Sequence, residues 1–234
     1  MAAKAPSSVI DGELDAGSAA DKVSEAIIRG IRSGTFVPGQ HLVEPDLTRR
    51  LGISRGSLRE ALKHLAAEGI VTLNRFRGAY IASLDRKSVL DLLQTLEPLA
   101  SLAARLAAEH CETEDQARQV ISVAAEIDEA NRTKNRAQYL ERRRYFYSVI
   151  VDIGGNRELE RAMPLTRTDL FRAQIEPIQS DKQRNRHASG YSKIARAIAE
   201  RNPAAAVRAV QRHFAGTRQT IEELPGDAFH GLGG

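Results

Sequence analysis

The first third of the chain contains three short helical patterns followed by a β-hairpin, and this order restricts the fold more than any other feature. The sequence predicts, in order, helices over Lys22–Arg32, Glu44–Leu51 and Arg55–Glu68 and strands over Ile70–Leu73 and Ala79–Ile81. Gly52 ends the second helix, and Ser54 is a favourable N-cap for the third. The order of a helix, a second helix, a tight turn, a third helix and a β-hairpin predicts a winged helix-turn-helix.

After Asp85 the sequence is a succession of long helical patterns with almost no strand signal. We predict helices over Lys87–His110, Thr113–Arg132, Arg136–Ile153, Asn156–Ile175, Asp181–Arg201 and Pro203–Glu223. Thr113 and Gln116 have the spacing of a capping box, and Pro164 is expected to kink or split the fourth of these helices. The fold class is therefore mainly α, with an N-terminal winged helix-turn-helix and a C-terminal all-α helical bundle.

These patterns divide the chain into four predicted segments. They are a flexible leader over 1–17, a DNA-binding domain over 18–84, a helical domain over 85–224 and a flexible tail over 225–234. Hydrophobic residues make up 42% of the 234 residues, enough for a packed core, and no apolar run is long enough to span a bilayer. With one cysteine, Cys111, and no apolar signal segment, we expect a cytoplasmic protein that does not enter a membrane.

The start of the third helix has the residues of a DNA-reading surface. Arg55 and Arg59 lie one turn apart and project from one face, where either could bind guanine in the major groove. Residues 21–83 hold ten Lys and Arg against six Asp and Glu, a local excess of positive charge that suits phosphate binding. The predicted DNA-binding residues are Arg49, Arg50, Ser54, Arg55, Ser57, Arg59, Arg75, Arg77 and Gly78.

Residues 26–82 resemble the GntR family of bacterial regulators. The resemblance rests on I-R-S-G-T-F-V-P-G-Q-H-L, on L-G-I-S-R-G-S-L-R-E-A-L-K-H-L-A-A-E-G-I-V and on R-G-A-Y-I, in that order. It implies that Arg55, Arg59 and the wing near Gly78 contact double-stranded operator DNA. It also implies a homodimer on a near-palindromic site.

The C-terminal part, roughly residues 86–220, resembles the FadR branch, whose effector domain is called FCD. The matching stretches are Leu96–His110, Phe146–Leu159 and Ala197–Phe214. Many FCD domains hold a divalent metal with one Asp and three His. The matching positions here are Arg143, Tyr147, Tyr191 and His213, and only the last is a usual ligand of such metals. We therefore predict no metal and no other cofactor.

The same positions lie on inward-facing stripes by spacing alone. Tyr139, Arg143, Phe146, Tyr147 and Ile150 form one stripe, and a buried Arg143 requires a partner. One hypothesis is that Arg143 binds an organic anion directly, and the other is that it pairs with an internal Asp or Glu. The expected effector-binding residues are Gln94, Arg143, Tyr147, Arg172, Tyr191 and His213, with Gln94 at a position where the family often has Arg.

The sequence contains no catalytic arrangement. It has no P-loop, no H-E-x-x-H and no paired carboxylates or Cys/His on one stripe, so we expect a regulator and not an enzyme. The function predicted is a sequence-specific regulator, most simply a repressor relieved by its effector, with the linker over 84–88 transmitting the change. The alternatives are a metal-dependent FCD sensor and an architectural DNA binder with a structural dimerisation bundle.

Overall fold

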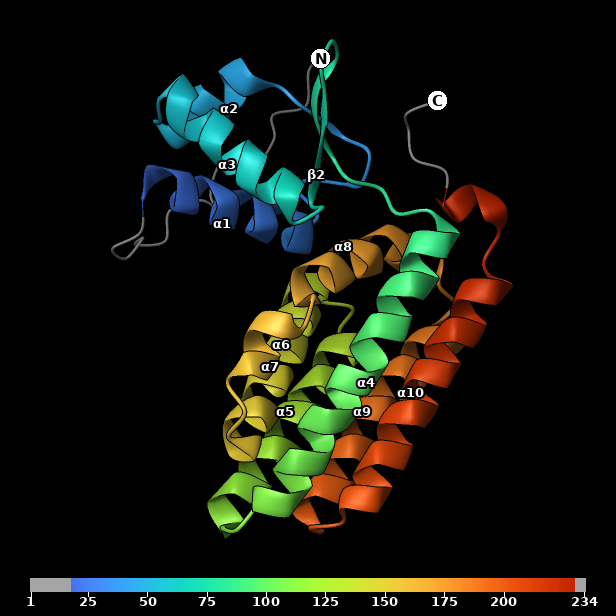
Figure 1. The fold of residues 1–234 in the computed structure, drawn as a ribbon. Coiled ribbons are helices and arrows are strands. Elements are labelled where there is room, and N and C mark those ends of the chain that lie inside the picture. Colours follow the sequence, from blue (N-terminus) through green and yellow to red (C-terminus); the bar gives the residue numbers. More distant parts are fainter. Residues whose placement is uncertain (1–17, 230–234) are drawn as a thin grey trace.

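A computed structural model describes residues 18–229. The leader predicted over residues 1–17 and the last five residues of the predicted tail lie outside the described residues. Within residues 18–229, no helix combines the length and apolar character that a membrane span requires. The described chain forms a small unit of helices and sheet above one end of a longer helical bundle (Figure 1).

The first unit is the predicted winged helix-turn-helix. Its elements are α1 (Ala19–Ser33), β1 (His41–Leu42), α2 (Glu44–Leu51), α3 (Arg55–Ala67), β2 (Val71–Asn74) and β3 (Gly78–Ile81). The sheet is antiparallel with β3 in the centre, between β1 and β2. The sequence did not indicate β1, because two residues are too few to establish an alternating pattern.

The apolar stripe of α3 forms the centre of the core of this unit. Leu58, Leu62 and Leu65 are fully buried, and they pack with Ile27 of α1 and Ile81 of β3 in one core. Their spacing puts the intervening polar residues on the opposite face of the same helix. The packing of α3 therefore determines which of its side chains face solvent.

The second unit is an all-helical bundle, as predicted. Its helices are α4 (Arg86–His110), α5 (Glu114–Arg132), α6 (Arg136–Gly154), α7 (Glu158–Ala162), α8 (Leu165–Ile175), α9 (Asp181–Ala199) and α10 (Pro203–Glu223), with a 3-10 turn over Glu176–Ile178. The long helix α4 packs against α6, α9 and α10, while α5 packs against α6 and α9. Thr113 and Gln116 form the predicted capping box at the start of α5.

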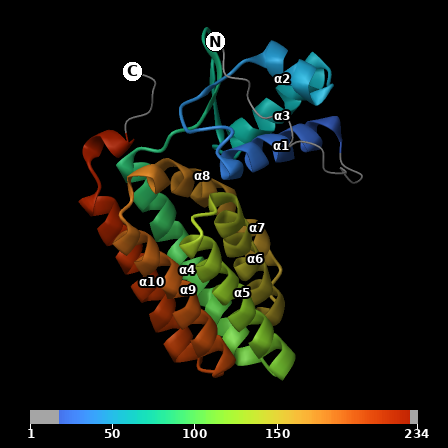
Figure 2. The ribbon, with the colours of Figure 1, turned by 180° about the vertical axis from the view of Figure 1, so that it is seen from behind.

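The helical segment predicted over Asn156–Ile175 is split into two helices, and the break lies at Pro164, where a kink or split was expected. Pro164, which has no backbone N–H to donate, separates α7 from α8. The break allows α8 to cross the end of the bundle between the bundle and α1, as the views in Figures 1 and 2 both show. Helix α8 is consequently buried on most of its surface, from Thr168 to Ala173 and at Ile175.

The tail predicted to be flexible over residues 225–234 is ordered as far as Phe229. Gly226–Phe229 form a 3-10 turn, and the Phe229 ring is buried beneath the guanidinium of Arg86 at 4.9 Å. Arg86 also donates a hydrogen bond to the carbonyl oxygen of Leu224 at 2.7 Å. Local composition does not reveal these contacts, because the partners lie about 140 residues apart in sequence.

The linker between the two units is held by one side chain of α8. Gln174 accepts the backbone N–H of Leu84 at 2.9 Å and donates to the carbonyl oxygen of Leu84 at 2.8 Å. Its amide also donates to the carbonyl oxygen of Ala228 at 3.0 Å. Gln174 therefore fastens both the linker and the C-terminal turn to the same helix.

Candidate functional site

Two serines organise the start of α3. The Ser54 hydroxyl accepts the backbone N–H of Ser57 at 3.1 Å, and the two hydroxyl oxygens lie 2.9 Å apart. A side-chain cap satisfies one of the free backbone N–H groups at the start of a helix, and the N-terminus of a helix carries partial positive charge. These serines therefore present the first turn of α3 as a rigid surface for an anionic partner.

Arg55 and Arg59 project from that turn into solvent. Both are exposed, while Leu58 between them is fully buried. The Nε of Arg59 lies 3.5 Å from a carboxylate oxygen of Glu44, an exposed ion pair of the kind that contributes little free energy. Both guanidinium groups are thus available to a ligand at little cost.

The tip of the β2–β3 hairpin carries a third exposed group. The Asn74 side-chain oxygen accepts the backbone N–H groups of Phe76 and Arg77 at 3.0 and 3.2 Å, and Gly78 has a φ of 86°. The Phe76 ring, between two arginines in sequence, is 91% exposed. Figure 1 shows this hairpin projecting away from the bundle. An apolar ring held at a basic wing tip is suited to a nucleic-acid groove.

The other two predicted DNA contacts differ in position. Arg49 is exposed and lies 3.5 Å from Asp46. Arg50 lines a cavity between α1, α2 and α6, together with Ala137 and Glu141 of the bundle. Arg50 therefore lies at the boundary of the two units, apart from the arginines of α3.

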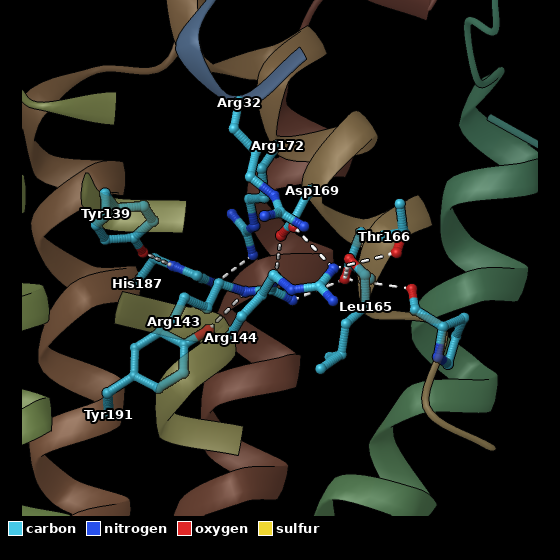
Figure 3. Close-up of polar contacts among 12 residues, drawn as sticks. Arg32, Tyr139, Arg143, Arg144, Leu165, Thr166, Asp169, Arg172, His187 and Tyr191 are labelled. Carbon is cyan, nitrogen blue, oxygen red and sulfur yellow. Dashed lines mark hydrogen bonds and ion pairs between the residues drawn. The ribbon is translucent and has the colours of Figure 1, made fainter. Parts of the chain in front are cut away.

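Each of the three guanidinium nitrogens of Arg143 on α6 has a protein partner. Its guanidinium donates to Asp169 at 2.7 Å, to the Thr168 hydroxyl at 2.8 Å and to the Tyr191 hydroxyl at 3.0 Å (Figure 3). Only 3% of the residue is exposed. Of the two hypotheses for Arg143, this geometry favours pairing with an internal carboxylate.

Asp169 of α8 is shared by three arginines from two helices, Arg32 of α1 and Arg143 and Arg144 of α6. One oxygen accepts from Arg143, and the other lies 3.2 Å from Nε of Arg32 and 3.5 Å from Arg144. Arg32 belongs to α1, so this buried carboxylate joins the winged helix-turn-helix unit to the interior of the bundle (Figure 3). Removing one member of a fully buried ion pair, such as Arg143 with Asp169, leaves an uncompensated charge and is strongly destabilising.

Next to this cluster, a second polar chain runs from Arg172 to Tyr139. Arg172 donates to Nε2 of His187, whose Nδ1 lies 2.5 Å from the Tyr139 hydroxyl. A guanidinium can only donate, so Nε2 must accept, and we assign the proton to Nδ1. This tautomer leaves His187 uncharged.

His213 of α10 completes the cluster. Its ring centroid lies 4.4 Å from that of His187 and 4.7 Å from that of Tyr191. Burial and the charge of Arg172 lower the pKa of His213 to about 3 and lower the pKa of His187 well below its ordinary value. Burial also lowers the pKa of Arg172, to about 10, so Arg172 stays charged at neutral pH.

The residues present do not fit a divalent metal. At the four positions that match metal ligands in FCD domains, the guanidinium of Arg143 donates to Tyr191, and His213 alone is a usual ligand. The carboxylate of Asp169 is occupied by arginines. Among residues 18–229, no three His, Cys, Asp or Glu side chains are grouped closely enough to hold a metal ion.

Five of the six expected effector residues lie together, and one does not. Arg143, Arg172, Tyr191 and His213 are joined by the contacts above, and the Tyr147 ring lies 5.6 Å from the Arg143 guanidinium. Gln94 is exposed and lines a groove between α4 and α10.

The sequence patterns did not point to His187, Asp169 or Phe76 as functional residues. His187 lies one turn before Tyr191, so extending that stripe by four residues would have found it. Asp169 belongs to no stripe, because α8 is buried on most sides. The exposure of Phe76 depends on the turn that Asn74 makes.

Two family models match the chain. Residues 19–81 match the model described as bacterial regulatory proteins, gntR family, and residues 90–216 match the FCD domain. The HTH-type transcriptional regulator YdhC of Bacillus subtilis is 23% identical over 188 residues, which cover 79% of this chain and 82% of that protein. The Nta operon transcriptional regulator of Aminobacter aminovorans is 29% identical over 53% of this chain and 58% of its own length.

Solved structures share the fold. E. coli McbR/YncC has a TM-score of 0.76 at 15% identity, covering 89% of this chain and 99% of that one. A GntR transcriptional regulator from Rhodococcus sp. RHA1 has a TM-score of 0.75 at 17% identity, covering 89% of this chain and all of that chain.

Proposed function

This chain belongs to the gntR family of bacterial regulatory proteins, in the branch with an FCD domain, and is a DNA-binding transcription regulator; we propose that it is a repressor released from its operator by a small organic anion. We further propose that it acts in the cytoplasm as a homodimer and binds its effector without a metal.

The DNA-binding part of the proposal rests on the exposed first turn of α3. Placed in the major groove, this turn brings Arg55 and Arg59 to base edges, while Arg75 and Arg77 on the wing reach phosphate or the minor groove. One such unit covers a single half-site. Two copies on a near-palindromic operator would supply the specificity that a regulator needs.

The effector part rests on the cluster around Arg172 and His213. Arg143, which the sequence suggested as the anion-binding group, is satisfied by Asp169, Thr168 and Tyr191. We therefore assign Arg143 a positioning role and assign anion binding to Arg172, with His213 beside it.

The main structural support for the proposal is helix α8, because it contacts the DNA-binding unit, the effector cluster and the linker between the two units. Asp169 pairs with Arg32 of the DNA-binding unit, Arg172 lies in the effector cluster, and Gln174 holds the linker at Leu84. A ligand changes DNA affinity only by binding the two states of the protein unequally. An anion at Arg172 that shifts α8 would act directly on the orientation of the DNA-binding units.

The first test is recovery of genomic DNA fragments by the purified protein at about 0.15 M salt, since selectivity depends on ionic strength. Enrichment of a few short palindromes supports a specific regulator. Uniform recovery of all fragments, lost on a small rise in salt, would instead support the architectural alternative.

The recovered operator then allows a matched comparison by fluorescence anisotropy. Arg55→Ala should reduce the preference for the operator over random DNA, as expected for the loss of one base contact. Arg196→Ala, an exposed arginine of α9 on the bundle, should bind as the unaltered protein does. Equal loss in both variants would count against α3 as the reading helix.

A further inference from the structure

A cavity of about 200 Å³ lies between α9 and α10, next to the cluster, and Arg143 is not among the residues that line it. Arg172 of α8 lines it at one end, and its walls come from the facing sides of α9 and α10. Thr217 and Thr220 add hydroxyl groups to the α10 wall. The cavity therefore reaches the buried cluster and is bounded by polar groups.

The charges around this cavity are of one sign. Four cationic side chains line it, namely Arg172, Arg186, Lys193 and Arg212, and its lining contains no Asp or Glu. Among the described residues, one ion pair involves these four cations, and it joins Arg186 to Glu223 at 3.7 Å, outside the lining of the cavity. Like charges around one hollow repel one another, and an anion in the hollow would relieve that repulsion.

The innermost cation lacks a counter-charge. Arg172 is 7% exposed, and within residues 18–229 no carboxylate lies within ion-pairing distance of it. Its Nη2 contacts uncharged groups, His187 and the Thr217 hydroxyl, and its buried Nε has no hydrogen-bond partner. A buried guanidinium is normally paired, so Arg172 is arranged for a partner that the chain does not provide.

A second buried donor or acceptor is also unsatisfied in the same place. Nδ1 of His213, on the cavity wall, has no hydrogen-bond partner. Gly190 of α9 makes room for this ring, since a Cβ at Gly190 would lie 2.1 Å from Nδ1. As a neutral imidazole, His213 can donate one hydrogen bond to an acidic oxygen.

We propose that this cavity binds a small dianion, with one acidic group at Arg172 and His213 and the second at the exposed pair Lys193 and Arg212. The proposal deepens the proposed function by giving the effector a charge and a place. We infer two anionic groups because the cations that line the cavity lie at two depths. Arg172 is buried, while Lys193 and Arg212 are exposed to solvent. The shared chemistry is a pair of negative charges, carried by a dicarboxylate or by a phosphate.

The test is isothermal titration calorimetry on the full chain, without DNA, using succinate and inorganic phosphate as probes. Acetate and chloride at matched ionic strength serve as controls. We expect one of the two dianions to bind at one site per chain, and the identity of that probe distinguishes carboxylate from phosphate. Failure of both dianions to bind more tightly than acetate would overturn the proposal.

Variants on the exposed side avoid disturbing the fold. The double substitution Lys193→Gln with Arg212→Gln should weaken binding of the dianion about tenfold or more, equivalent to roughly 1.4 kcal/mol. Arg208→Gln, an exposed arginine one turn earlier on α10 that does not line the cavity, should leave binding unchanged. An equal effect of both changes would mean that general charge, and not this cavity, attracts the anion.

Operator binding separates this inference from the proposed function. A dianion that binds in the calorimeter yet leaves operator affinity unchanged would uphold the site and contradict its role as effector site. A protein that does not bind any operator would contradict the proposed function without altering the calorimetric result.

Discussion

Arg32, near the end of α1, lies with its Nε 3.2 Å from the carboxylate of Asp169 on α8, across the boundary between the DNA-binding unit and the bundle. The same carboxylate accepts a hydrogen bond from Arg143 deep in the bundle. The Asp169 carboxylate therefore contacts both the DNA-binding unit, through Arg32, and the interior of the bundle beside the effector cluster, through Arg143. Any movement of α8 must change both contacts together.

Removing the charge of Asp169 should strongly destabilise the protein. Asp169→Asn leaves the buried Arg143 without its counter-charge, and we expect the free energy of unfolding to fall by roughly 3–5 kcal/mol in urea denaturation. The double variant Arg143→Met with Asp169→Leu should lose less than the sum of the two single changes, because it removes the pair together. Additive losses would show that the pair is not coupled.

Arg32→Gln should weaken communication more than stability. Arg32 is partly exposed, so its loss costs little folding free energy. The substitution removes the ion pair with Asp169, which is the only ion pair between α1 and α8 within residues 18–229. We expect a dianion to change operator affinity less in this variant than in the unaltered protein, measured by anisotropy. Arg29→Gln, on the same helix but paired with Glu25, provides the control and should respond normally.

The two groups of arginines on the DNA-binding unit should differ in their effects. Arg55→Ala should cost roughly 1–3 kcal/mol of operator affinity and relax base preference at one position, as expected for a guanine contact. Arg77→Ala should weaken operator and random DNA alike and reduce the dependence of log Kd on log salt by about one unit. If Arg77→Ala changed base preference while Arg55→Ala did not, the roles of helix and wing would be reversed.

Two glycines that line the cavity should respond oppositely to alanine. Gly190→Ala places a Cβ against the His213 ring and should destabilise the protein by roughly 1–3 kcal/mol. At Gly216 a Cβ would meet nothing closer than 3.6 Å, so Gly216→Ala should stabilise the helix by up to about 1 kcal/mol. Thermal unfolding of both variants measures the difference, and equal shifts would contradict the close approach at Gly190.

Acid should destabilise the protein through its buried histidines. Folding lowers the pKa of His213 from its ordinary 6.5 to about 3, because burial and Arg172 disfavour the charged ring. Below pH 6.5 the unfolded chain takes up a proton that the folded chain excludes, so the free energy of unfolding falls as the pH decreases from 6.5 towards 3. Near pH 5 the loss from His213 should be roughly 2 kcal/mol.

The variant His213→Gln checks this assignment, because it removes the titrating group and keeps a polar side chain. Its stability should depend less steeply on pH between 6.5 and 5 than that of the unaltered protein. Identical slopes would assign the acid sensitivity to other groups.

The sequence alone determined the class of fold and the outline of the DNA-reading surface. The signals for the helix-turn-helix and the wing are all local in sequence. They are the spacing of apolar residues, the helix-ending Gly52, the N-cap Ser54 and the basic hairpin, so the order of neighbouring residues is sufficient to predict both. The stripe containing Arg143 and Tyr147 was recognised as buried for the same reason, and both residues are buried.

Only the tertiary structure decided what those buried groups contact. Asp169 lies 26 residues from Arg143 and 137 from Arg32, and no local pattern connects them. Pro164 indicated a break, but the crossing of α8 between the two units comes from packing of surfaces distant in sequence. That packing places Arg143 against Asp169 and places Arg172 in the lining of a cavity. A charged side chain pairs with groups that are near it in space, and these groups need not be near it in sequence.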